Sequence, residues 1–118
     1  MSERDQLLVL RDALRAFAAE RDWERFHTPK NLAMALAGEA GEVIEHFQWL
    51  SADESAHLPE ERRTEVALEL ADVLLYLVRL ADVLDIDLGE AAQRKLALNA
   101  GRYPADKARG RSDKYDKL

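Results

Sequence analysis

The sequence predicts an all-α protein built as an antiparallel four-helix bundle. Apolar residues recur at steps of three and four along four segments, which is the spacing of one helix face. Strand-like alternation is almost absent, and the connectors are short, as they are between antiparallel neighbours. The 118 residues suffice for one domain. A chain of this size buries only about two-thirds of its unfolded surface, so forming an oligomer would add stability.

Composition restricts the class of partner. Hydrophobic residues make up 47% and charged residues 34%, which is typical of a soluble globular protein. The formal net charge of −6 argues against a nucleic-acid duplex, but a small anion fits if a metal ion neutralises local acid. The sequence has no cysteine, no apolar run of the roughly 18 residues that cross a membrane, and no signal-peptide pattern in MSERDQLLVL. We therefore expect a cytoplasmic protein without a membrane partner.

Two helices are expected in the first half of the chain. The first runs from about Glu3 to Arg21, with Ser2 as its cap and Asp5 at its third position. Its apolar stripe consists of Leu7, Leu10, Leu14 and Phe17. The second runs from about Pro29 to Leu50, because Thr28-Pro29 has the pattern of a cap followed by a first-turn proline. Its apolar stripe consists of Leu32, Leu36, Val43, Ile44 and Phe47.

The second half continues with a loop, SADESAHLP, that begins with a short helical turn. The third helix, from about Glu60 to Leu84, is the most apolar and is expected to be buried on more than one side. Asp87 caps the fourth helix, which ends near Asn99–Gly101. Residues 1–104 thus form one helical domain, and the polar residues 105–118 form a flexible tail. The five Lys and Arg side chains of the tail either close over a bound phosphate or stay solvated.

Two pairs of carboxylates accompany the two most apolar helices. Glu39 and Glu42 lie three residues apart in the second helix, and Glu69 and Asp72 lie three apart in the third. Residues at this spacing share a helix face, and helices packed about 8–10 Å apart bring such faces together. Four partly buried like charges repel unless a cation lies between them, and Mg²⁺ or Mn²⁺ prefers carboxylate oxygen. The alternative is that all four are solvated surface residues.

A di-iron site of the ferritin type is a second metal hypothesis, and it requires Glu-x-x-His motifs within helices. Glu24–His27 and Glu54–His57 have that spacing. Each histidine, however, lies two residues before a proline, where no helix is under way. A site without imidazole ligands favours Mg²⁺ or Mn²⁺ over iron.

Other polar and aromatic residues are candidates for ligand binding. Lys95, Asn99 and Arg102 recur at steps of four and three, so they either grip a polyphosphate or form a solvated cationic helix end. Trp49 follows the second helix and is either buried or able to stack on a base. His27 precedes that helix, and a lone histidine is more often structural than functional. We expect Trp23 in the core, and Arg79 and Arg94 as ordinary surface charges.

The carboxylates and their surroundings carry a family resemblance. Glu39-Ala-Gly-Glu42, a spacer of 26 residues and Glu69-Leu-Ala-Asp72 form an ExxE…ExxD pattern. It lies among the blocks RDWERFHTPKNLAMALAGEAGEVIEHFQW, ELADVLLYLVRLAD and KLALNAGRYP. From about Phe17 to Pro104 the chain resembles the all-α nucleoside triphosphate pyrophosphohydrolases of the MazG-like superfamily, and within it the dCTP pyrophosphatase group.

The resemblance implies an enzyme that cleaves a (deoxy)nucleoside triphosphate, dCTP or a modified dCTP, to the monophosphate and pyrophosphate. It implies Mg²⁺ bound by Glu39, Glu42, Glu69 and Asp72, with Glu42 or Glu39 activating the attacking water. It implies triphosphate binding by Lys95, Asn99 and Arg102, and a base pocket formed by His27 and Trp49 with Tyr76 near the sugar or base. Family members form homodimers or homotetramers whose sites draw on more than one chain. The alternative function is a non-catalytic helical bundle that senses a nucleotide or binds another protein.

Overall fold

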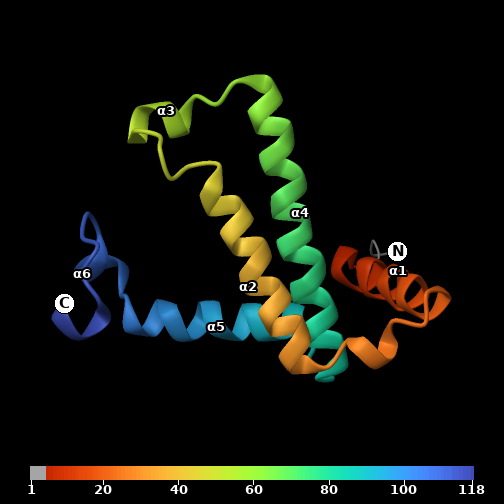
Figure 1. Cartoon of the computed structure of the whole chain (residues 1–118). Helices are drawn as coiled ribbons and strands as arrows, with labels where there is room; N and C mark the ends of the chain where they lie inside the picture. The colour runs from red at the N-terminus through yellow and green to blue at the C-terminus, as the bar shows by residue number, and fades with distance from the viewer. Residues whose placement is uncertain (1–4) are drawn as a thin grey trace. The chain divides into compact units, whose positions relative to one another are not determined.

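The computed structural model describes residues 5–118, and every regular element among them is helical. The main helices are α1 (Gln6–Glu20), α2 (Pro29–Glu45), α3 (Ala52–Ala56), α4 (Glu60–Val83), α5 (Leu88–Arg102) and α6 (Ala105–Ala108) (Figure 1). Two 3-10 turns, η1 (Glu24–Phe26) and η2 (Tyr115–Lys117), complete the set. No helix in this part of the chain is long and apolar enough to cross a membrane. The predicted all-α class is therefore confirmed.

Local capping explains where the first two long helices begin. The Asp5 side chain accepts a hydrogen bond from the Leu7 amide at 2.8 Å, so Asp5 is the cap of α1 and lies before its first turn. The prediction of Asp5 at the third helical position is therefore wrong, and the predicted cap Ser2 lies outside the described residues. Thr28 caps α2 as predicted, because its Oγ1 accepts from the Asn31 amide at 3.1 Å.

The end of α2 differs from the prediction by about one turn of helix. α2 ends at Glu45, and the amides of His46 and Leu50 bond to carbonyls only three residues back, as in turns. The next connector contains α3, whose Ser51 and Glu54 form a reciprocal capping box at 3.1 and 2.8 Å. The helical turn expected at the start of this loop is therefore confirmed.

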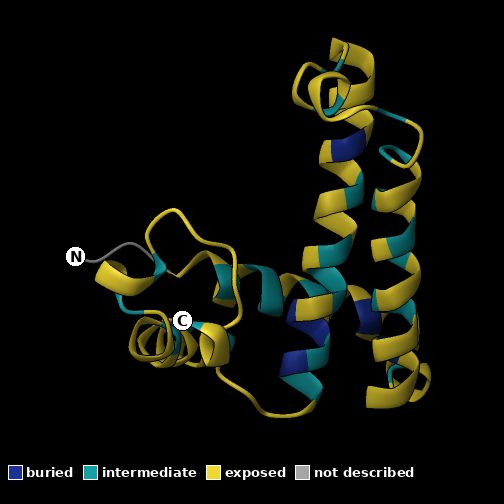
Figure 2. Cartoon of the chain, turned by 90° about the vertical axis from the view of Figure 1, so that its left-hand side faces the viewer, coloured by how far each residue is buried: buried dark blue, intermediate teal, exposed yellow. Residues whose placement is uncertain are grey.

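The chain forms two compact units, and the first ends at Ile86. In this unit α4 packs along α2 and against α1 (Figure 1). The few buried apolar residues all lie in these three helices (Figure 2). They are Ala18, Leu32, Val66, Val78 and Ala81. The third helix was expected to be buried on more than one side, but its apolar residues Leu70 and Leu84 are exposed, and so is Ile44 of the predicted second-helix stripe. The main packing partners of α4 in this unit are α2 and α1, which leave part of its surface uncovered.

The second unit, Asp87–Leu118, contains α5, α6 and η2. Asp87 caps α5 as predicted and accepts from the Glu90 amide at 3.0 Å. Within this unit Tyr115 packs edge-on against Tyr103, and the Arg102 guanidinium lies 4.9 Å from the centre of the Tyr115 ring. The domain boundary at residue 104, the packing of the fourth long helix into a bundle, and the oligomer stay predictions.

Candidate active site

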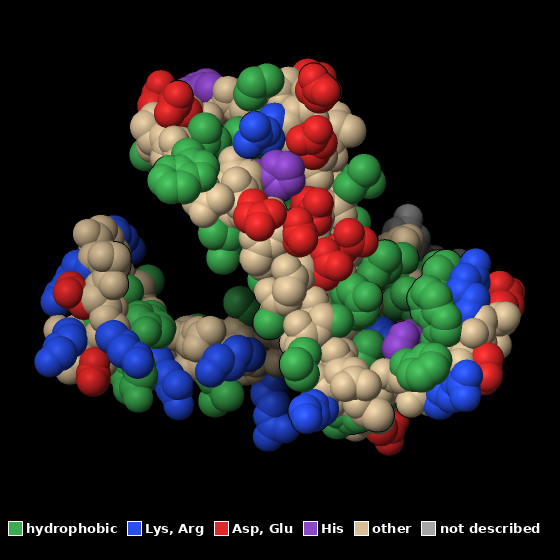
Figure 3. Space-filling view, in the orientation of Figure 1, with side chains coloured by type: hydrophobic (Ala, Val, Ile, Leu, Met, Phe, Trp, Pro, Cys, Tyr) green, Lys and Arg blue, Asp and Glu red, His purple; other side chains and the backbone are tan. Residues whose placement is uncertain are grey.

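Three of the predicted metal ligands meet where α2 and α4 pack together. Glu39 comes from α2, and Glu69 and Asp72 come from successive turns of α4. Each offers a carboxylate oxygen, and these oxygens all lie within 4.8 Å of one another. Figure 3 shows acidic side chains gathered on one face of this helix pair. The i, i+3 spacing on α4 and the packing of α2 thus together build an acidic cluster, defined as Glu39, Glu69 and Asp72.

The surroundings of this acidic cluster favour a bound cation. Partial burial, and then the charges of Asp72 and Glu69, raise the pKa of Glu39 above its usual value. No Lys or Arg forms an ion pair with the three carboxylates among residues 5–118. An all-oxygen set of close, mutually repelling carboxylates suits a hard divalent ion such as Mg²⁺.

The fourth predicted ligand, Glu42, lies beside the acidic cluster but outside it. Its pKa is raised above the usual value, most by the charge of Glu45 and next by that of Glu69. Glu39 acts on it more weakly. Glu42 is therefore close enough to feel the charge of the cluster without placing an oxygen within ligand distance of all three members.

A cavity of about 300 Å³ opens beside Asp72. Its walls come from α1, from the connector that contains η1, and from α4. The lining residues are mostly apolar or aromatic, with a few polar groups, as is typical of small-molecule pockets. They are Leu14, Phe17, Trp23, His27, Asp72, Leu75, Tyr76 and Arg79. The predicted residues His27 and Tyr76 therefore line the same cavity, and Asp72 belongs to both the cavity and the acidic cluster.

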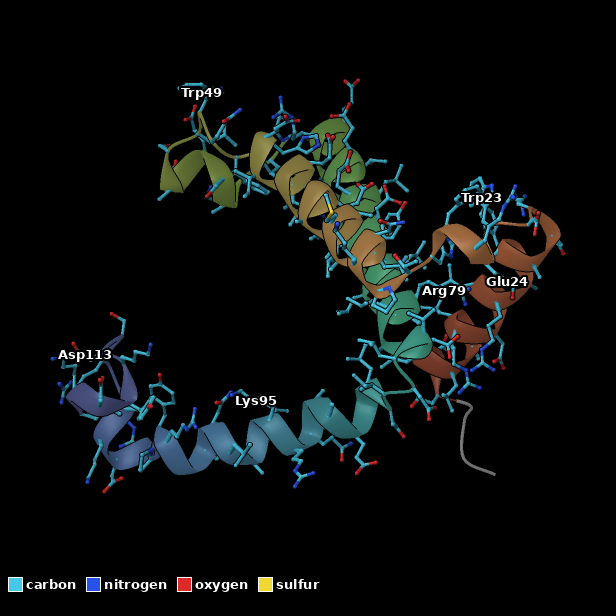
Figure 4. The ribbon with its side chains drawn as sticks, turned by 60° about the horizontal axis from the view of Figure 1, so that its bottom comes forward. Trp23, Glu24, Trp49, Arg79, Lys95 and Asp113 are labelled. Atoms are coloured by element: carbon cyan, nitrogen blue, oxygen red, sulfur yellow. The ribbon has the colours of Figure 1, made fainter. Side chains whose placement is uncertain are left out.

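Arg79 is the residue that the sequence predictions missed. It was expected to be a surface charge, but it is only 8% exposed. Its Nε donates to Nδ1 of His27 at 3.0 Å, and its Nη1 lies 3.5 Å from Oδ2 of Asp82. Figure 4 shows Arg79 on the side of α4 that faces the connector with Trp23. The available signal was an arginine inside the apolar run LLYLVRLADVL, where a solvated residue is out of place.

The structure also tests the predictions for the two tryptophans and for His27. Trp23 is half-exposed rather than a core residue, and its ring packs edge-on against Phe17 and His27 in the cavity wall. The pKa of His27 is lowered, first by burial and then by the charge of Arg79. Trp49 is 87% exposed in the connector after α2 and does not line this cavity.

The predicted phosphate-binding residues all belong to α5 in the second unit. Lys95, Asn99 and Arg102 follow one another at steps of four and three along this helix. Figure 4 labels Lys95 on it. Lys95 and Arg102 are exposed, and Asn99 is half-buried. The Arg102 guanidinium is held over the Tyr115 ring, which limits its motion.

Comparison with known proteins agrees with this geometry. Residues 35–118 match the model of the MazG-like family. This range of the chain contains all four predicted metal ligands. The chain is 50% identical over 104 residues to dCTP pyrophosphatase 1 of Homo sapiens and 48% identical to that of Mus musculus. These matches cover 86% of this chain but only 61% of each relative. A crystal structure of a pyrophosphatase from Archaeoglobus fulgidus superposes with a TM-score of 0.81 at 43% identity, over 88% of this chain and 97% of that one. The chain belongs to the MazG-like family.

Proposed function

We propose that this chain is a Mg²⁺-dependent nucleoside triphosphate pyrophosphohydrolase that converts dCTP, or a modified dCTP, to the monophosphate and pyrophosphate. The observation that carries the proposal is the acidic cluster beside the cavity, with Asp72 shared between them. This arrangement supports binding a phosphate-bound cation next to a base or sugar. The relatives named dCTP pyrophosphatase 1 support the choice of substrate. In a cell the activity would remove unwanted nucleotides from the cytoplasmic pool.

Glu39, Glu69 and Asp72 would hold the ion, with Glu42 beside them, and Mn²⁺ would fit the same oxygen ligands. When bound, the ion neutralises charge that develops on the phosphate oxygens. The ion also removes the repulsion among the three carboxylates, so we expect the ligand-free protein to gain stability when Mg²⁺ is added.

Glu42 or Glu39 would act as general base. Both have a raised pKa in the metal-free protein, and for Glu42 the first cause is the charge of Glu45, which is not one of the three cluster carboxylates. The glutamate takes a proton from water while the water oxygen bonds to either the α- or the β-phosphorus, which the bridging oxygen joins. The bond to the bridging oxygen breaks, and the two products are the monophosphate and pyrophosphate.

The remaining predicted residues would bind the rest of the substrate. Lys95, Asn99 and Arg102 present two cations and an amide along one helix, which suits a triphosphate. His27 and Tyr76 line the cavity, which suits a nucleobase and its sugar. Trp49 is free to stack on a base because its ring is exposed.

We further propose a homodimer or homotetramer. Exposed apolar side chains on α2 and α4, Ile44, Leu68, Leu70 and Leu74 among them, support association with further copies. Light scattering should give a mass of two or four times 13.4 kDa. A monomer at micromolar concentration would contradict this part of the proposal.

The function is tested by incubating the protein with Mg²⁺ and a panel of canonical and modified nucleoside triphosphates. We expect pyrophosphate and no inorganic phosphate, with dCTP or a modified dCTP as the best substrate and no turnover in EDTA. Glu69→Gln should abolish turnover while leaving the circular dichroism spectrum unchanged. No pyrophosphate from any substrate would refute the enzyme. Calorimetric binding of a nucleotide without turnover would instead favour the non-catalytic bundle.

A further inference from the structure

A chain of polar side chains ends at the wall of the cavity, and three of its members, Arg15, Asp82 and Arg79, have no role in the proposed reaction. Arg15 on α1 donates two hydrogen bonds to Asp82 on α4, at 2.6 and 2.7 Å. Asp82 in turn faces Arg79, which donates to His27 in the cavity wall. The chain therefore runs from an exposed arginine to a residue of the predicted base pocket.

The hydrogen bond between Arg79 and His27 fixes where the imidazole proton lies. A guanidinium keeps its protons in proteins, so Nε of Arg79 can only donate. Nδ1 of His27, 3.0 Å away, must accept and therefore has no proton. The neutral ring then has its proton on Nε2. His27 is in this way a hydrogen-bond donor through Nε2, and Arg79 determines that role.

Arg79 also has a donor group of its own to offer. Its Nε and Nη1 are engaged by His27 and Asp82, whereas Nη2 has no hydrogen bond among the described residues. The same holds for Nε2 of His27. No buried side-chain nitrogen or oxygen in this part of the chain lacks a partner, so neither atom is buried. Both residues line the cavity, so each brings to its wall one N–H donor that no described residue occupies.

We propose that Arg79 is a positioning and specificity-determining residue of this cavity. It holds His27 as an Nε2 donor and adds Nη2 as a separate donor, so the cavity favours a ligand that presents an acceptor to each of them. N3 of cytosine is one such acceptor. Uracil has an N3–H donor at the same place, and that donor would face a donor. This inference rests on the proposed function for its substrate, but not for the position of the imidazole proton.

Two substitutions separate the two roles of Arg79. The amide nitrogen of Gln lies as many bonds from Cα as Nε of Arg, so Arg79→Gln keeps a donor for His27 and loses Nη2. The methyl group of Met takes that same position, so Arg79→Met loses both donors. Arg63→Met, at an exposed position on the same helix, is the matched control.

The first measurement is long-range ¹H–¹⁵N NMR of the histidine rings. We expect His27 protonated on Nε2 in the wild type and in Arg79→Gln, and a mixture of tautomers in Arg79→Met. A proton on Nδ1 in the wild type would overturn the proposal, whether or not the protein is an enzyme. The wild-type and Gln spectra decide the point even if Arg79→Met does not fold.

The second measurement is the Michaelis constant for dCTP and for dUTP with Mg²⁺. For Arg79→Met we expect the KM for dCTP to rise about 10- to 100-fold, as for one or two lost bonds to a charged donor, with kcat within about threefold. For Arg79→Gln we expect a KM for dCTP between those of the wild type and Arg79→Met. The KM for dUTP should change little in either variant. An equal loss on both substrates, or a loss in kcat alone, would show a merely structural role. If no triphosphate is turned over, calorimetric binding of dCMP against dUMP gives the same comparison.

Discussion

Replacing Asp82 by Asn tests the polar chain that fixes the cavity wall. The Asp82 carboxylate is only 11% exposed and is shared by two arginines, Arg15 from α1 and Arg79 from its own helix. An amide of the same shape keeps the volume and removes the charge. Arg79 then stays buried with no counterion, and α1 loses its ionic link to α4.

The magnitude follows from the exposure of each partner. The Arg15 side chain is 52% exposed, so water screens its ion pair with Asp82. The expected loss of stability therefore includes no contribution from that ion pair. A buried charged donor that loses its partner costs about 1–3 kcal/mol. We therefore expect the free energy of unfolding to fall by about 2 kcal/mol. For a domain of this size that corresponds to a decrease in Tm of roughly 10 °C.

Urea unfolding followed by tryptophan fluorescence measures this effect, because both tryptophans lie in the first unit. The hydrogen bonds and charges of the two arginines hold the pKa of Asp82 below its usual range. The stabilisation is therefore complete above the unfolded pKa of about 3.9 and is lost as the pH falls through the lower folded pKa. The difference between wild type and Asp82→Asn should be constant from pH 7 to pH 5 and should shrink below about pH 4.

Two outcomes would refute the reasoning. One is a loss below about 0.5 kcal/mol, the range of ordinary surface substitutions. The other is a difference that persists unchanged at pH 3. Asp53→Asn, at an almost fully exposed carboxylate, is the control and should have little effect. In an Arg79→Met background Asp82→Asn should cost clearly less, because the buried charge is already gone.

Three further predictions concern the acidic cluster and the core. Glu39→Gln should leave the Tm of the metal-free protein unchanged or raise it, since one of three repelling carboxylates is neutralised, while calorimetry should show Mg²⁺ binding lost. Because the pKa values of Glu39 and Glu42 are raised, protons should compete with Mg²⁺ for them at a higher pH than for ordinary glutamates. Mg²⁺ titrations should therefore show steadily weaker binding as the pH is lowered from 7 to 5. Leu32→Ala should cost about 2–5 kcal/mol in urea unfolding, because Leu32 is 1% exposed; a loss under 1 kcal/mol would mean that α2 contributes little to the core.

The sequence predicted the helices well because their apolar periodicity is local. Their ends were harder to place where the chain offered no distinct signal. Ser2 and Asp5 are both good caps, and only the bond to the Leu7 amide shows that Asp5 is used. Apolar periodicity continues past Glu45 to Leu50 with no glycine or proline to mark a break, so the end of α2 could not be predicted.

In the candidate site, too, the sequence predicted what depends on nearby residues and missed what depends on distant ones. The spacing of Glu69 and Asp72 within α4 placed them on one face, and the packing of α2 then adds Glu39. Arg79 escaped prediction because its partner His27 lies 52 residues away, beyond any helical period. No pattern in the sequence records such a contact, so an arginine in an apolar run is visible only as an anomaly.

Because Asp72 belongs to both the acidic cluster and the cavity, the two sites are not thermodynamically independent. A group that enters the cavity would alter the electrostatic field at Asp72 and the freedom of its side chain, and the proposed cation would use that carboxylate. By reciprocity, the factor by which the cation changes affinity for the cavity ligand equals the factor by which that ligand changes affinity for the cation. A nucleoside without phosphates would therefore still report on the cation. Its affinity, measured with and without Mg²⁺, gives the coupling free energy between the two halves of the site.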